Sequence, residues 1–414
     1  MKQVIIGSGA AGIAAAKTIR NINKNNDITI VSSDESIYSR CMLHKYTGHE
    51  RDQTSLSFVP NDFFTTNNIT WYPGESVLSI DTKNNHIQLQ NKTLPYDNLL
   101  IATGSEAVIP NIGQLKTATN VYGYRHLTDA KTIREKAPNV KKILIVGAGL
   151  VGLDVAYALL KLKKPVIIVE MAPQILSLNI DSTAAVVYQK LFEQNGCTFR
   201  LNSKITNTQS NQNGEITHIT LETGENIACD MVIVAAGVRP STKLLEGSGI
   251  EYDRAIKVDP YLKTSCANVY AAGSVTGLGE IWQSAVKQGE TAAKNMCNIK
   301  TQFTDTFTAK NTLNFFDLPT LSVGNINPES DDTVHIQTIP NSYKKIIIRN
   351  NIVTGIILQG NLNYSGIWQY LIKNKIDVSQ LKKSLWSISF ADFYGIDPDG
   401  QYKYNCPVAN QKQS

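Results

Sequence analysis

The chain has 414 residues, of which 42% are hydrophobic and 18% are charged. This composition is typical of a globular protein and excludes a disordered chain, and the length leaves room for two or three domains. A net charge of +5 is too small at this length to indicate a nucleic-acid-binding protein, although it would favour an acidic protein partner.

The first residues run directly into a predicted strand and a glycine-rich segment, without the longer apolar run of a signal peptide. No stretch approaches the roughly eighteen uninterrupted apolar residues of a membrane-spanning helix. We therefore expect a cytoplasmic protein.

In chain order, the first feature is a segment that recurs later in the sequence. Each copy has a β-branched strand, the pattern GxGxxG, an alanine-rich helix and a second apolar strand, which together predict a strand–helix–strand unit. The strands are expected at 4–6 and 28–31 in the first copy and at 143–146 and 166–169 in the second. The expected nucleotide contacts are Gly7, Ser8, Gly9, Ala10, Ala11 and Gly12, then Gly147, Gly149, Leu150, Val151 and Gly152.

The glycines have distinct physical tasks in such a unit. The first permits a tight turn out of the strand, the second lets a pyrophosphate approach the backbone, and the third lets helix and strand pack closely. The helix amino terminus then faces the phosphates with free N–H groups and its positive dipole end. Because this context occurs twice, the sequence predicts two dinucleotide-binding folds.

Glu170 ends the second strand of the second copy, where a carboxylate can accept hydrogen bonds from both ribose hydroxyls and repel a 2′-phosphate. This position favours NADH over NADPH. The first copy has Ser32 there, followed by Asp34 and Glu35, so its ribose contact is less well defined. A strand-end glutamate that only faces water is the alternative for Glu170.

The remaining segments predict smaller elements. Alternating runs at 87–90 and 217–221 suit small antiparallel insertions, and beyond about residue 300 the alternation at 312–323 and 345–358, followed by a helical stretch at 367–375, predicts a compact α+β domain. The six cysteines form no CxxC pair, which excludes a zinc ribbon or a local redox-active dithiol, and we expect no metal site. They are Cys41, Cys197, Cys229, Cys266, Cys297 and Cys406.

With these motifs the chain resembles the FAD-dependent pyridine nucleotide-disulfide oxidoreductase superfamily, in the branch of NADH oxidases, coenzyme A-disulfide reductases, rubredoxin and ferredoxin reductases and NADH-nitrite reductases. Three further segments carry the resemblance, at 100–105, 232–240 and 269–274. It implies an α/β fold with two Rossmann-like domains, for FAD and NAD, and a C-terminal α+β domain. Further cofactor contacts implied in this way are Val77, Ala102, Thr103, Gly104, Gly237, Gly273 and Ser274.

One residue departs from the family pattern. An Asp normally follows the glycine of the third segment and accepts a hydrogen bond from a ribityl hydroxyl, whereas this chain has Ser274. Loss of one charge-assisted hydrogen bond would weaken FAD binding by roughly tenfold to a hundredfold. We still expect FAD to bind, and a flavin-poor nucleotide-binding or assembly subunit is one alternative.

The segment 38–45 resembles the Arg-Pro-x-Leu-Ser-Lys segment of the rubredoxin and ferredoxin reductases. By this resemblance Arg40 faces the FAD phosphates and Lys45 lies near the isoalloxazine ring, where a cation supports flavin reduction. Cys41 is either a redox-active thiol, with a pKa lowered by Arg40 and Lys45, or a residue that only fills the proline position. A surface role for Arg40 and Lys45 is the alternative.

The expected boundaries are 1–112 and 241–300 for the FAD domain, 113–240 for the NAD domain and 301–414 for a C-terminal interface domain that often mediates dimers. The resemblance implies that the chain is an enzyme in which NADH reduces FAD, from which electrons pass to an acidic redox protein or partner subunit. A single-cysteine oxidase, peroxidase or coenzyme A-disulfide reductase acting through Cys41 is the other enzymatic alternative.

Overall fold

The computed structural model describes residues 1–279, 281–304, 310–381, 383–396 and 399–403. The chain forms two compact units. One contains Met1–Met171 and Gly196–Asp305, and the other contains Ala172–Asn195 and Thr306–Ser414. Cys406 lies outside the described residues.

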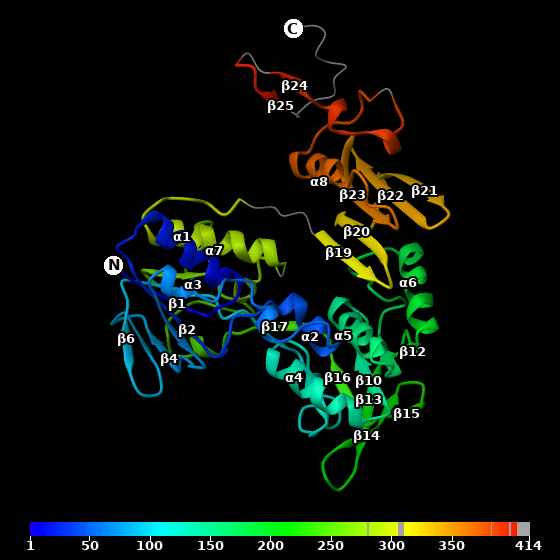
Figure 1. Ribbon diagram of the computed structural model, residues 1–414, viewed down its shortest axis with the longest axis horizontal. Coiled ribbons are helices and arrows are strands. Elements are labelled where there is room, and N and C mark those ends of the chain that lie inside the picture. The colour runs from blue at the N-terminus through cyan, green and yellow to red at the C-terminus, as the bar shows by residue number, and fades with distance from the viewer. Residues whose placement is uncertain (280, 305–309, 382, 397–398, 404–414) are drawn as a thin grey trace. The chain divides into compact units, whose positions relative to one another are not determined.

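The first unit begins with a parallel sheet in the order β18-β7-β1-β2-β3. Its strands are β1 (Lys2–Ile6), β2 (Asp27–Ser32), β3 (Ile69–Pro73), β7 (Asn98–Ile101) and β18 (Val269–Ala271). Helices α1 (Ala10–Ile22) and α7 (Trp282–Met296) lie side by side (Figure 1). They share a hydrophobic cluster with Ile5, Ile30 and Leu100 of the strands. The small residues of α1 allow this close packing.

The second sheet of this unit repeats the plan, again with parallel pairs, in the order β12-β11-β10-β16-β9. The first glycine-rich repeat connects β1 to α1 and the second connects β10 to α5, so the duplication in the sequence is a duplication in structure. The elements are β9 (Val121–Gly123), α4 (Leu127–Lys136), β10 (Ile143–Val146), α5 (Leu150–Lys161), β11 (Val166–Val169), β12 (Cys197–Arg200) and β16 (Met231–Val234).

Small sheets and short helices decorate the two folds. The predicted alternating runs are confirmed as strands of two three-stranded antiparallel sheets, and a two-stranded ribbon joins β8 to β17. These elements are α2 (Leu43–Thr47), α3 (Phe63–Thr66), β4 (Ser79–Asp81), β5 (His86–Gln88), β6 (Thr93–Pro95), β8 (Ser105–Ala107), β13 (Ile205–Ser210), β14 (Ile216–Leu221), β15 (Asn226–Ala228) and β17 (Val238–Pro240).

The second unit has an antiparallel sheet in the order β19-β20-β23-β22-β21, with α8 (Ser365–Asn374) packed on β23. Each predicted alternating segment here is a hairpin, because two-residue turns with positive φ at 316–317 and 350–351 divide it. The strands of this sheet are β19 (Lys310–Phe315), β20 (Leu318–Gly324), β21 (Thr333–Ile339), β22 (Ser342–Arg349) and β23 (Ile352–Gln359). A separate two-stranded antiparallel sheet is formed by β24 (Gly395–Ile396) and β25 (Tyr402–Lys403).

Helix α6 (Ser182–Gln194) also belongs to the second unit, although the chain reaches it directly after β11. Its N-cap residue, Asp181, accepts hydrogen bonds from the Ala184 N–H at 3.1 Å and from the Tyr343 hydroxyl at 2.6 Å, and pairs with Lys345 at 3.1 Å. The capping residue therefore anchors the helix to β22. The boundaries expected from sequence, which put α6 in the segment 113–240, stay a prediction.

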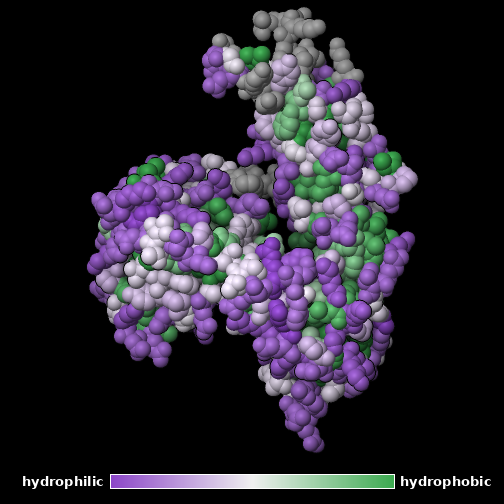
Figure 2. Space-filling model, viewed as in Figure 1, coloured by the Kyte–Doolittle hydropathy of each residue, from purple (hydrophilic) through white to green (hydrophobic). Residues whose placement is uncertain are grey.

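The predicted fold class is confirmed: two Rossmann-like folds are followed by a C-terminal domain with a mixed composition of sheet and helix. Figure 2 shows a surface that is mostly hydrophilic, with apolar residues scattered over it. Among the described residues, no helix combines the length and the apolar character needed to cross a bilayer.

Candidate functional site

In the first glycine-rich turn, backbone atoms block a side chain at the first and third glycines, whereas the middle glycine has open space beside it. Gly7 has φ of +107°, and a Cβ there would overlap the Ala102 carbonyl oxygen; a Cβ at Gly12 would overlap the Gly7 oxygen. At Gly9 a Cβ would meet only the Arg40 guanidinium, at 3.6 Å. This is the arrangement that a pyrophosphate needs, because its oxygens must approach the backbone at the middle glycine.

The second turn has the same geometry. Gly147 has φ of +104° and a Cβ there would press on the Ala235 carbonyl oxygen, while a Cβ at Gly152 would overlap the Gly147 oxygen. A Cβ at Gly149 would find nothing within 4 Å. Leu150 and Val151 open helix α5, as Ala10 and Ala11 open α1. The two turns therefore offer the same open backbone to a dinucleotide.

In each fold, a polar side chain at the end of the second strand forms a hydrogen bond with the glycine-rich turn. The side chain is a carboxylate in the second fold and a hydroxyl in the first. In the second fold the Ala148 N–H donates to Glu170 Oε2 at 2.6 Å. In the first fold the Ser8 hydroxyl donates to the Ser32 hydroxyl at 2.8 Å, and both side chains are buried. Glu170 thus lies at the expected position, and one of its oxygens accepts from the turn itself.

Asp34 and Arg40 contact each other beside the first turn. Arg40 Nη2 lies 2.8 Å from Asp34 Oδ2, and the hydroxyl of Tyr38 donates to Asp34 Oδ1 at 2.8 Å. Tyr38 in turn accepts from the Leu127 N–H at 3.2 Å, and burial raises the pKa of this tyrosine well above its ordinary value. The network holds the guanidinium of Arg40 above Gly9, which suits the predicted contact with FAD phosphates.

Cys41 lies in a short 3-10 turn before α2, and its surroundings do not lower the pKa of the thiol as the redox-active alternative requires. Although part of the side chain is exposed, burial of the thiol raises its pKa; the carboxyl of Asp154 adds to the rise and Arg125 opposes it. The flanking cations have other partners, since Arg40 pairs with Asp34.

Lys45 extends from α2 towards α5, where it shares a carboxylate with another lysine. Its Nζ lies 2.9 Å from Glu50 Oε2, and Lys161 Nζ lies 3.2 Å from Glu50 Oε1. Burial raises the pKa of Glu50, but the hydrogen bonds from the two lysines outweigh it and the net pKa is lowered. Lys45 also lies 6.0 Å from the ring centroid of Tyr157.

Asp154 of α5 is a residue that the sequence-based analysis missed. Burial raises its pKa to about 7, against the attraction of Lys45, which lowers it. Burial also lowers the pKa of His44 to about 4, helped by Lys45. Asp154 and His44 lie 3.6 Å apart, and burial disfavours the charged form of each. The available signal was a single carboxylate within the apolar run of α5.

The remaining predicted residues follow the carboxyl ends of strands in the two parallel sheets. The Thr103 hydroxyl donates to the Ser241 carbonyl at 3.2 Å, and Gly104 follows with φ of +73°. Gly273 has φ of +85° and precedes a partly exposed Ser274. Gly237 is exposed, with φ of +101°. Val77 follows the carboxyl end of β3 and packs against the hydrophobic cluster between β1 and the small sheet of β4 to β6, and its contact with FAD stays a prediction.

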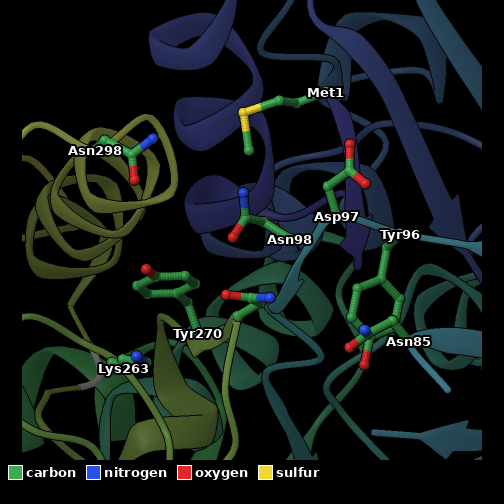
Figure 3. Close-up of a pocket in the computed structure, with 9 residues that line it drawn as sticks. Met1, Asn85, Tyr96, Asp97, Asn98, Lys263, Tyr270 and Asn298 are labelled. Atoms are coloured by element: carbon green, nitrogen blue, oxygen red, sulfur yellow. The ribbon is translucent and has the colours of Figure 1, made fainter. Parts of the chain in front are cut away.

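A cavity of about 510 Å³ lies at the opposite edge of the first sheet. Figure 3 shows Asn98, Tyr270 and Lys263 around it, near the amino ends of β7 and β18. The glycine-rich turns lie at the carboxyl ends of the strands, where ligands bind in open α/β sheets. This cavity is therefore distinct from the dinucleotide sites.

A family model described as pyridine nucleotide-disulphide oxidoreductase matches residues 1–289, and one described as rubredoxin NAD+ reductase C-terminal domain matches residues 310–376. The chain is 33% identical to an NADH oxidase of Methanocaldococcus jannaschii, covering 73% of this chain and 71% of that protein. It is 29% identical to a nitrite reductase [NAD(P)H] of Bacillus subtilis over 92% of this chain, but spans only 48% of that longer protein.

An NADH-rubredoxin oxidoreductase of Clostridium acetobutylicum is 27% identical, and the similarity covers 94% of this chain and 97% of the relative. The crystal structure of NADH:rubredoxin oxidoreductase from that organism superposes with a TM-score of 0.76 at 24% identity, covering 92% of this chain and 97% of the other. This structural likeness shows a common fold.

Proposed function

Because the chain belongs to the pyridine nucleotide-disulphide oxidoreductase family, we propose that it passes electrons from NADH through FAD to a redox protein or partner subunit. The family is one of FAD-dependent oxidoreductases that use nicotinamide dinucleotides, and this chain is one of them. Bound FAD supplies the chemistry, by accepting a hydride and releasing electrons to an acceptor. The chain's own residues bind and orient the two dinucleotides.

Each fold has a defined task in this proposal. The turn at Gly7–Gly12 and the cation of Arg40 would hold FAD, and the turn at Gly147–Gly152 with Glu170 would hold NADH. Holding both ligands on one compact unit supplies proximity and orientation, which lower the barrier by converting a bimolecular step into a unimolecular one. By the family resemblance Lys45 would lie beside the flavin, and its ion pair with Glu50 fixes its position.

The raised pKa of the Cys41 thiol favours a protein acceptor over a small oxidant. A single-cysteine oxidase, peroxidase or disulfide reductase needs a thiolate, and the environment of Cys41 raises its pKa. The similarity to an NADH-rubredoxin oxidoreductase over nearly both whole chains supports the same choice. The net charge of +5 is compatible with an acidic partner.

The test compares the parent protein with Cys41→Ser under anaerobic conditions. We expect both to reduce an acidic rubredoxin or ferredoxin with NADH at rates within about twofold of each other, because no step uses the thiol. Loss of activity in the serine variant, with coenzyme A disulfide or peroxide as the better acceptor for the parent, would support the thiol mechanism instead. A dimer and a cytoplasmic location stay predictions.

A further inference from the structure

The turn after β18 has a backbone conformation that needs outside support. Gly273 has φ of +85° and ψ of −160°, a region that only glycine occupies readily, and Gly277 closes the turn with φ of +69°. A Cβ on Gly273 would lie 3.2 Å from the Cβ of Ala11, so the turn packs against the start of α1. Ser274, in the position expected to face FAD, is part of this turn.

The side chain of Gln288, in α7, stabilises this turn by hydrogen bonds. Its side chain is fully buried, and its Oε1 accepts a hydrogen bond from the Gly273 N–H at 2.9 Å and lies 2.8 Å from the Thr276 hydroxyl. Its Nε2 donates to the Ser284 hydroxyl at 3.2 Å, which fixes which end of the amide faces the turn. The same Thr276 hydroxyl lies 2.8 Å from the Gly273 carbonyl oxygen.

The helix that carries Gln288 cannot shift along the sheet. At the next residue, Gly289, a Cβ would overlap the Ala11 carbonyl oxygen, so the backbones of α7 and α1 are in contact (Figure 1). This close packing fixes the position of Gln288 relative to the turn. A buried N–H without an acceptor costs free energy, so without this amide the turn would relax towards another conformation.

We propose that Gln288 is a positioning residue for FAD, which presets the turn 273–276 so that its backbone and Ser274 face the cofactor. Gln288 does not contact FAD and acts only through Gly273 and Thr276. The preset turn lowers the entropy cost of binding. This role matters more here than with an Asp at 274, because a serine has less charge and reach to compensate for a misplaced turn.

The test measures FAD affinity by titrating the flavin-free full chain, and NADH affinity of the same preparation at the second fold. Gln288→Leu is expected to weaken FAD binding by about tenfold to a hundredfold, because the Gly273 N–H loses its acceptor. NADH affinity is expected to stay unchanged. Gln283→Leu is the matched control, because Gln283 lies on the same helix with an exposed side chain.

Two further variants test whether the accepting oxygen of Gln288 is the group that matters for FAD binding. Ser284→Ala removes only the partner of Nε2 and is expected to weaken FAD binding by less than Gln288→Leu. If Gln288→Leu does not fold, Gln288→Glu keeps an accepting oxygen and is expected to bind FAD within about tenfold of the parent. Unchanged FAD affinity in Gln288→Leu, or a parallel loss of FAD and NADH affinity in any folded Gln288 variant, would overturn the proposal.

Discussion

The two glycine-rich turns share a backbone and differ in the polar groups placed around it. Gly7 and Gly147 have φ of +107° and +104°, and in each fold the third glycine abuts the carbonyl of the first. Around this common turn, the first fold places the cation of Arg40 over its middle glycine, whereas the second leaves Gly149 open. A cation over the turn suits a cofactor that stays bound, and an open turn suits a dinucleotide that exchanges in each cycle.

The comparison separates residues that build the fold from residues that select the ligand. The outer glycines are required by backbone contacts whatever binds. The strand-end residues, Ser32 and Glu170, contact the same part of their turns through different groups. Variants at matched positions of the two folds can therefore test each class of residue independently.

The largest effects on stability and cofactor binding are expected at the third glycine of each glycine-rich turn. Gly12→Ala and Gly152→Ala each force a methyl group onto a carbonyl oxygen and should cost about 2–4 kcal/mol of unfolding free energy. Gly12→Ala should purify without flavin, while Gly152→Ala should keep its flavin but lose reduction by NADH. Absorption spectra before and after NADH measure both. Gly149→Ala is the control for stability, since its methyl group meets nothing; flavin loss in Gly152→Ala would show that the folds are not independent.

The next effect is expected at Glu170. Glu170→Ala removes the acceptor for the Ala148 N–H and the proposed acceptor for the ribose hydroxyls, and should raise the KM for NADH by about tenfold to a hundredfold. The preference for NADH over NADPH should shrink at the same time. Steady-state kinetics with both nucleotides measure this. Ser32→Ala in the first fold is the matched variant, and a change in KM for NADH there as large as in Glu170→Ala would contradict the assignment.

A gain of function is expected at the ribityl turn. Ser274→Asp restores the carboxylate of the family pattern and should tighten FAD binding by about tenfold. Fluorescence titration of the flavin-free protein gives the dissociation constant, with Ser274→Asn as the uncharged control. Weaker binding in the Asp variant would mean that the turn does not point residue 274 at the cofactor.

The last prediction is a pH dependence of the free energy of unfolding that arises from Asp154. Its pKa is raised to about 7 in the folded protein, so its stabilising contribution is complete below its ordinary pKa of 3.8 and is lost as pH rises through about 7. Asp154→Asn should remove this fall, so that the variant gains stability relative to the parent from pH 5 to pH 8. Thermal unfolding across this range measures the difference. A difference that does not change with pH would contradict the raised pKa.

The sequence predicted most of what local patterns can encode. Both Rossmann-like units, the two small sheets and the positions of Gly7 and Glu170 followed from glycine spacing and strand alternation, whereas Arg40 followed only from the family resemblance. The hairpin turn at Phe316 and Asp317 was not separated from its strands, because a bulky residue such as Phe316 rarely adopts positive φ and no glycine marks this turn.

The site residues that the sequence did not predict depend on packing between helices that are distant in the chain. Asp154 enters the site only because α2 and α5 pack together, and Gln288 only because α7 packs on α1. The alternative of a lowered pKa for Cys41 rested on the cations beside it in sequence, and those cations have other partners in space. Arg40 is in fact paired with Asp34, and the nearest opposing carboxyl comes from α5.

The most direct test of the electron path is an anaerobic titration followed by visible absorption. NADH should bleach the flavin absorption of the purified protein, NADPH should do so far less effectively, and an oxidised acidic rubredoxin or ferredoxin should then restore the absorption in both the parent and Cys41→Ser. A flavin that NADH bleaches but that only a small disulfide or peroxide restores, and only when Cys41 is present, would contradict the account.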